Sequence, residues 1–145
     1  MSAMASAIQP EQGRRHRARH LWIIPGLAIA FFASTVAGEH GLGLTPLLLF
    51  GILPHLPVLL GIAQATERGQ LAPRAVPLFN LMHHPAAPLA LLAVAATGLI
   101  SAFWLVGAMA WLSHVVVDWG MGDGLRSADG YRLHHVRRLI GVGGR

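Results

Sequence analysis

The sequence contains no cysteine among its 145 residues. This absence excludes disulfide bonds, thiolate metal ligands and cysteine nucleophiles. Any metal site in the chain must therefore use histidine, carboxylate or amide side chains. Lysine is absent as well, so arginine supplies all 11 basic side chains. Exclusive use of arginine, together with abundant alanine, glycine and leucine, is typical of a GC-rich bacterial genome.

Charge is scarce, because 12% of the residues are charged, whereas soluble domains carry about 25%. Apolar residues make up 54% of the chain, and long uncharged runs follow Leu21. A soluble fold of this size could not bury all of these runs, so the composition predicts an integral membrane protein. Because the arginines flank the apolar runs, they indicate topology and contact with lipid headgroups, and we expect no nucleic-acid partner.

Four apolar runs are each long enough to cross the hydrocarbon, which requires a helix of about 17 residues or more. The runs cover residues 21–37, 44–63, 76–97 and 101–119. Prolines interrupt the second and third runs, as membrane helices tolerate, and a short turn around Gly98 separates the last two. We therefore predict an all-α integral membrane bundle of four transmembrane helices. Its three parts are a disordered basic arm over 1–20, a four-helix transmembrane domain over 21–120 and a basic cytoplasmic tail over 121–145.

The placement of arginine predicts the orientation of the bundle. With four spans, the N-terminal arm, the loop over 64–75 and the C-terminal tail lie on one side, and these segments hold all 11 arginines. The positive-inside rule makes that side cytoplasmic, which predicts a multi-pass protein of a bacterial inner membrane with both termini in the cytoplasm. The first span also resembles a signal peptide. We favour an uncleaved helix because further spans follow directly.

Polar side chains inside the predicted spans indicate a site, because ionisable groups in a bilayer normally face a bundle interior, a partner or a water-filled cavity. At about 1.5 Å of rise per residue, His55, His83 and His114 lie at similar depths in the cytoplasmic half. Asp118 stands four residues after His114 and shares its helix face. Imidazole and carboxylate suit zinc, iron or manganese, so we predict a divalent metal site. Its ligands would be His55, His83, His114 and Asp118, with His135 of the tail as a further candidate.

Three further residues are expected at this site. Asn80, three residues before His83, would orient water or substrate and act with Asp118 as the catalytic pair. Arg126 and Arg132 would bind a phosphate group of the substrate. In the alternative interpretation, each histidine only hydrogen-bonds the aspartate or a backbone carbonyl freed by a nearby proline. The sequence leaves both interpretations open.

These motifs resemble domain of unknown function 4260, a family of small bacterial membrane proteins. The segments that resemble it are Leu53-Pro54-His55, Phe79-Asn80-Leu81-Met82-His83, His114 through Asp118, and Gly122 through Arg126. The resemblance covers about residues 21–135 and implies that a final histidine of the family falls on His135. His55 stands where that family usually has aspartate, which would change the net charge and the metal preference of the site. A more distant resemblance, to membrane-bound metal-dependent hydrolases, implies hydrolytic chemistry.

The residues and the resemblance together favour a metal-dependent hydrolase that acts on a lipid phosphoester at the inner leaflet. Membrane lipids would be its partners, and a homo-oligomer is left open. The alternative is non-enzymatic, a helical bundle that binds a metal or proton or scaffolds a partner membrane protein. The outer halves of the spans hold few polar side chains, which argues against a continuous conduit.

Overall fold

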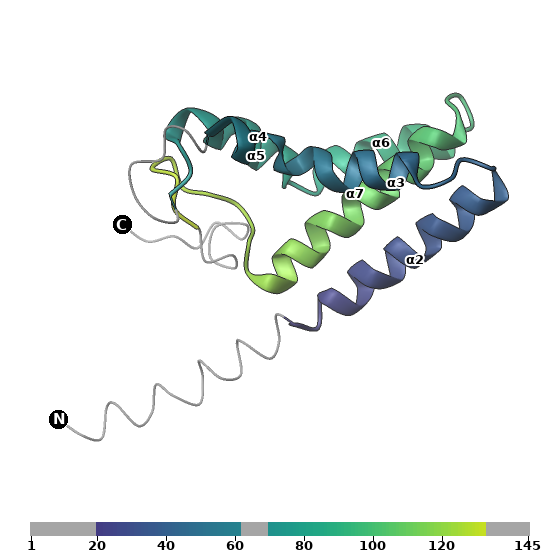
Figure 1. Ribbon diagram of the computed structural model, residues 1–145, viewed down its shortest axis with the longest axis horizontal. Coiled ribbons are helices and arrows are strands. Elements are labelled where there is room, and N and C mark those ends of the chain that lie inside the picture. The colour runs from purple at the N-terminus through teal and green to yellow at the C-terminus, as the bar shows by residue number, and fades with distance from the viewer. Residues whose placement is uncertain (1–19, 62–69, 133–145) are drawn as a thin grey trace, which may run out of the picture.

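The computed structural model describes residues 20–61 and 70–132, and these residues are largely helical. Four helical segments follow one another in the predicted order (Figure 1). They are α2 (Ile23–Glu39); α3 (Thr45–Ile52), η1 (Leu53–His55) and α4 (Leu56–Gly61); η3 (Pro73–Ala75), α5 (Val76–Met82) and α6 (Ala86–Ala96); and α7 (Ala102–Met121). The predicted all-α class is confirmed. Most of the predicted basic arm and the last part of the tail lie outside the described residues.

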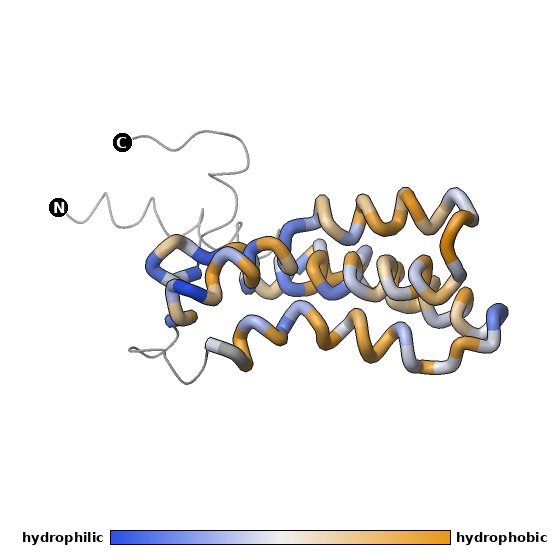
Figure 2. Tube along the Cα trace, turned by 90° about the horizontal axis from the view of Figure 1, so that it is seen from above, coloured by the Kyte–Doolittle hydropathy of each residue, from blue (hydrophilic) through white to orange (hydrophobic). Residues whose placement is uncertain are grey.

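Two helices within the described residues are long and apolar enough to cross a membrane. They are Pro73–Ala96, with 24 residues, and Ala102–Met121, with 20 residues. Two further helices, Ile23–Glu39 and Thr45–Leu59, are apolar but shorter. Figure 2 shows apolar residues along the helices and hydrophilic residues gathered at the end of the bundle near the last described residues. Large apolar side chains also remain exposed on the outside of the bundle, which is the arrangement that a lipid environment favours.

Helix α7 is the element against which α2, α3 and α6 pack. Glycines allow two of these close approaches, because Gly26 of α2 faces Val117 and Gly107 of α7 faces the ring of Phe50 in α3. The hydroxyl of Ser113 donates a hydrogen bond of 2.7 Å to the carbonyl oxygen of Gly26. Two of the three neighbours of α7, α2 and α3, are therefore held at short range, and the Ser113 hydrogen bond fixes the register of α2.

The second and third segments are each interrupted near the middle. Pro54 lies in the 3-10 turn η1 between α3 and α4, and His55 ends that turn. In the third segment α5 ends at Met82, and His83 follows before α6 begins. The indole nitrogen of Trp111 donates a hydrogen bond of 2.7 Å to the carbonyl oxygen of Met82, which satisfies a backbone group at the interruption. The interruption of the second segment thus carries His55, and that of the third carries His83 and His84.

Beyond α7 the chain folds back onto the bundle. The helix ends at Gly122, which has a φ of 86°. Residues 126–132 then form a short hairpin, termed the cap hairpin, in which Arg126 and Arg132 pair through an antiparallel bridge. The backbone N–H of Leu71 donates a hydrogen bond of 3.0 Å to the carbonyl oxygen of Gly130. Gly130 has a φ of 89°, and a Cβ there would clash with the Leu71 carbonyl. The hairpin is therefore closely seated on the start of the third segment.

Candidate metal site

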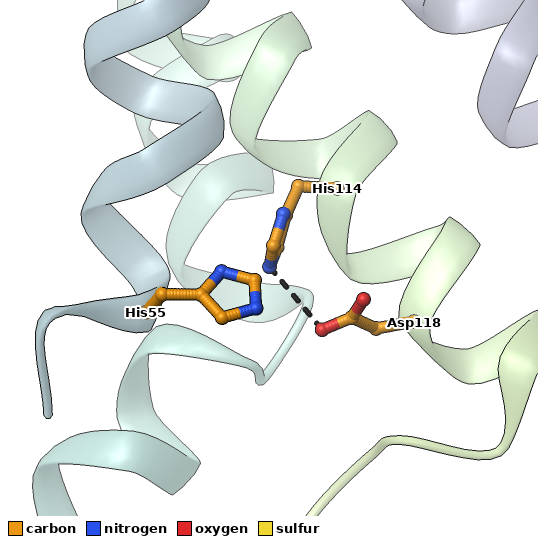
Figure 3. A group of neighbouring side chains, drawn as sticks. All are labelled: His55, His114 and Asp118. Carbon is orange, nitrogen blue, oxygen red and sulfur yellow. Dashed lines mark ion pairs between the residues drawn. The ribbon is translucent and has the colours of Figure 1, made fainter. Parts of the chain in front are cut away.

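Three of the helical segments bring three histidines and one aspartate together. His55 of η1 and His114 and Asp118 of α7 offer ligand atoms that all lie within 4.8 Å of one another, a group that could hold a metal ion (Figure 3). His83, directly after α5, joins them, because its ring centroid lies 5.9 Å from that of His55 and 5.4 Å from that of His114. These four residues are termed the His/Asp cluster. They are the four predicted ligands that fall within the described residues.

Asp118 connects the cluster through a single oxygen atom. Its Oδ2 lies 3.3 Å from Nε2 of His83 and 3.2 Å from Nε2 of His114. Asp118 is buried, and His83 is only 1% exposed. A buried carboxylate is costly unless a cation or hydrogen bonds compensate its charge. An imidazole N–H, a protonated imidazole or a bound cation next to Asp118 could supply this compensation.

The backbone of α5 fixes the orientation of His83. Its Nδ1 lies 2.9 Å from the carbonyl oxygen of Phe79, four residues earlier. Since a carbonyl oxygen only accepts hydrogen bonds, Nδ1 carries the hydrogen, and Nε2 of a neutral His83 keeps a lone pair that a cation can use. The Phe79 ring also stacks on the His83 ring, with centroids 3.9 Å apart and an interplanar angle of 16°. Hydrogen-bonded partners orient metal-ligating histidines in the same way.

Two of the distances between donor atoms fit a small tetrahedral ion. Ligand atoms about 2.0–2.1 Å from a tetrahedral zinc ion lie roughly 3.3–3.4 Å apart. The two nitrogen-to-oxygen distances at Asp118, 3.3 and 3.2 Å, are close to this value. Within the described part of the chain, neither His83 Nε2 nor His114 Nε2 has a hydrogen bond of normal geometry. Nitrogens that lie this close to a carboxylate oxygen without pointing at it are well placed to share a cation with it.

Asn80 is anchored to the cap hairpin. Its Nδ2 donates a hydrogen bond of 2.9 Å to the carbonyl oxygen of Arg126, and the Arg126 N–H donates one of 2.7 Å to Asn80 Oδ1. The side-chain amide thus pairs with the backbone as a neighbouring strand would, and it holds the hairpin against α5. These contacts give Asn80 a positioning role. A direct role in orienting water or substrate stays a prediction.

The two arginines expected to bind a phosphate both lie in the cap hairpin. The guanidinium carbon of Arg126 lies 5.3 Å from the centroid of the Phe79 ring, and its side chain is mostly buried. Burial, followed by the nearby charge of Arg132, lowers the pKa of Arg126 from its ordinary value of 12.5, although arginine keeps its charge in proteins. Arg132 is exposed, and its Nε lies 2.7 Å from Oδ1 of Asp123. Phe79 therefore contacts both a histidine of the cluster and an arginine of the hairpin.

Sequence reasoning missed three residues that shape this site. Phe79 stands four residues before His83, and the spacing of an aromatic and a histidine on one helix face is a signal that could have identified it. Asp123 and Trp111 act through partners distant in sequence or outside regular helices, and no local pattern marks them. His135, the fifth predicted ligand, lies outside the described residues.

Comparison with known proteins gives one match. A family described as Domain of unknown function (DUF4260) matches residues 24–139. The matched range includes the His/Asp cluster and the cap hairpin. No curated protein and no solved structure matches the chain.

Proposed function

The chain belongs to the DUF4260 family, and from that premise and the His/Asp cluster we propose that it is a multi-pass membrane protein with a divalent metal site between its helices. In this proposal all four helical segments span a bacterial inner membrane, with both termini in the cytoplasm. The confinement of all 11 arginines to the first arm, the loop over 64–75 and the tail supports this orientation. The apolar exterior of the described helices supports a lipid environment.

One observation carries the metal site: Oδ2 of Asp118 lies within 3.3 Å of two histidine nitrogens. His83, His114 and Asp118 would hold the ion, and His55 would complete the set from the exposed side of the cluster. Three nitrogen donors and one oxygen donor, two of the nitrogens lying 3.2 and 3.3 Å from the oxygen, favour zinc, with iron and manganese as the alternatives. His135 remains a proposed further ligand from the tail.

We further propose that the site hydrolyses a lipid phosphoester. A divalent ion there would generate a nucleophile from water at neutral pH and polarise the bond under attack. The water oxygen would bond to phosphorus, the ester P–O bond would break, and a proton from the water would go to the departing alcohol. Arg126 and Arg132 would pair with the phosphate oxygens, since guanidinium groups form strong charge-assisted hydrogen bonds with phosphate. Asn80 would contribute by holding Arg126 in place.

The same distances also suit ion pairs between protonated histidine and aspartate. The second candidate is therefore a non-enzymatic bundle, in which Asp118 forms buried ion pairs with His83 and His114. Such a bundle would bind a metal or a proton, or would scaffold a partner membrane protein. Breaking a buried pair of this kind costs about 3–5 kcal/mol, so the cluster would then serve stability.

Elemental analysis of the detergent-purified protein separates the two candidates. Wild type, His114→Ala, Asp118→Ala and a control, His40→Ala in the exposed loop after α2, are each reloaded with zinc, iron(II) or manganese(II). The proposal expects about one ion per chain in wild type and in the control, and loss of the ion in the two cluster variants. If no reloaded sample of the wild type holds stoichiometric metal, the metalloenzyme proposal fails. A phosphate-release assay on vesicles containing phosphatidic acid, with and without chelator, then tests hydrolysis.

A further inference from the structure

The second helical segment carries a row of exposed aliphatic side chains along one side. They are Leu48, Leu49, Ile52, Leu56 and Leu59. From Leu49 onward their spacing is three or four residues, and Leu48 lies four residues before Ile52, so all five share one helical face over roughly 16 Å of helix. Residues 45–61 contain no acidic residue and no arginine. This surface is termed the α3/α4 face.

His55 interrupts the α3/α4 face, on which it is exposed between Ile52 and Leu59. Its ring centroid nevertheless lies 4.6 Å from that of His114, and it belongs to the group that could hold a metal ion. Figure 3 shows that the three side chains of this group converge from two separate helical segments. By contrast, His83 and Asp118 are buried. The His/Asp cluster is therefore reached from the α3/α4 face at His55 and covered by protein at its two buried members.

We propose that the α3/α4 face is a lateral entrance to the cluster for an anionic membrane lipid. The acyl chain of the lipid lies along Leu48, Leu49 and Ile52, which lead from His55 toward the bilayer centre, and the phosphate headgroup reaches the cluster at His55. This inference rests on the proposed function and deepens it by assigning the direction from which the substrate arrives.

The apolar chemistry of this face, together with the positive charge of Arg126 beyond the cluster, supports an anionic lipid as its occupant. An uncharged aliphatic surface suits a hydrocarbon chain and offers a water-soluble phosphoester no polar contact before His55. Beyond the cluster, the stacked Phe79 and His83 rings lead to the Arg126 guanidinium, a cation for an anionic headgroup. A second copy of the chain on the same face would instead cover His55 and close the cluster.

Photo-crosslinking of the whole chain in phosphatidylcholine vesicles tests this entrance. The probe is phosphatidic acid with a diazirine in the middle of one acyl chain, and the labelled residues are mapped by mass spectrometry. The outward face of α2 serves as the reference, because Leu27 there is 59% exposed and Ile52 on the α3/α4 face is 61% exposed. We expect several-fold more label on the α3/α4 face. Excess unlabelled phosphatidic acid should remove this difference, and diacylglycerol should not.

Two matched variants sharpen the comparison. Ile52→Gln should reduce the competable label several-fold, whereas Leu27→Gln should leave it unchanged. Equal labelling of the two faces in wild type would overturn the entrance. Protection of the α3/α4 face from lipid would also overturn it, since that result is expected if a second copy covers the face.

The metal content of the same samples keeps the two proposals distinguishable. A protein that holds its ion but labels evenly refutes the lateral entrance and leaves the metal site intact. A protein without metal that shows competable labelling on the α3/α4 face supports the entrance and refutes the metal site.

Discussion

Replacing Gly107 with alanine would test how closely α3 must approach α7 to build the cluster. A Cβ at this position would lie 2.5 Å from Cδ2 and 2.6 Å from Cε2 of Phe50, whereas carbon atoms in contact lie about 3.5–4.0 Å apart. The Phe50 ring is buried and has edge contacts with Phe103 and Trp104, at centroid distances of 6.1 and 5.8 Å. Because the ring has little room to turn, α3 itself must move by about 1 Å.

The expected magnitude combines two effects of opposite sign. Overpacking of this kind costs about 1–3 kcal/mol, whereas replacing glycine by alanine inside a helix gains about 0.5–1 kcal/mol. Gly51, in α3, has no heavy atom within 4 Å of the corresponding Cβ, so Gly51→Ala reports the gain alone. The free energy of unfolding of Gly107→Ala should therefore be about 1–3 kcal/mol lower than that of Gly51→Ala.

The measurement is the loss of helical circular dichroism during titration with sodium dodecyl sulfate in mixed micelles. Adding Phe50→Leu to Gly107→Ala should recover part of the loss, because leucine leaves room for the new methyl group. Since α3 leads directly into the turn that carries His55, the displaced helix should also weaken metal binding by about tenfold or more. If Gly107→Ala is at least as stable as Gly51→Ala, the contact between α3 and α7 inferred here is incorrect.

Three further substitutions test individual contacts. Asn80→Ala removes both hydrogen bonds to the Arg126 backbone, so the free energy that holds the cap hairpin in place should fall by about 1–3 kcal/mol. The hairpin should then be cleaved faster in limited proteolysis, and unchanged cleavage would contradict the anchoring role. Gly130→Ala should detach the same hairpin, because the new Cβ meets the Leu71 carbonyl at a φ of 89°, and faster hydrogen exchange at the Leu71 amide would report it. Trp111→Phe leaves a backbone carbonyl at the interruption of the third segment without its indole donor, and should lower the unfolding free energy by about 1–3 kcal/mol.

Much of the fold follows from local properties of the chain. Uncharged runs of span length, separated by turn residues, predict four helical segments, and the described residues contain them in that order. The glycine run after Trp119 predicts the end of the last helix, and α7 does end at Met121 beside Gly122. His114 and Asp118 lie four residues apart, so helical geometry alone places them on one face. Counting residues along each helix likewise predicts that His55 and His83 lie at about the same depth in the bilayer as His114.

Only the tertiary structure decided how these residues meet. Depth along a helix follows from counting residues, but the direction of a side chain around the helix axis depends on packing and on where the helix is interrupted. That His83 and His114 approach the same oxygen of Asp118 depends on the end of α5 and on its approach to α7. The hydrogen bond from Asn80 to the Arg126 carbonyl oxygen joins residues 46 positions apart, and no local pattern encodes it. The sequence by itself determined the elements and the ligand types, whereas long-range packing around α7 determined the site.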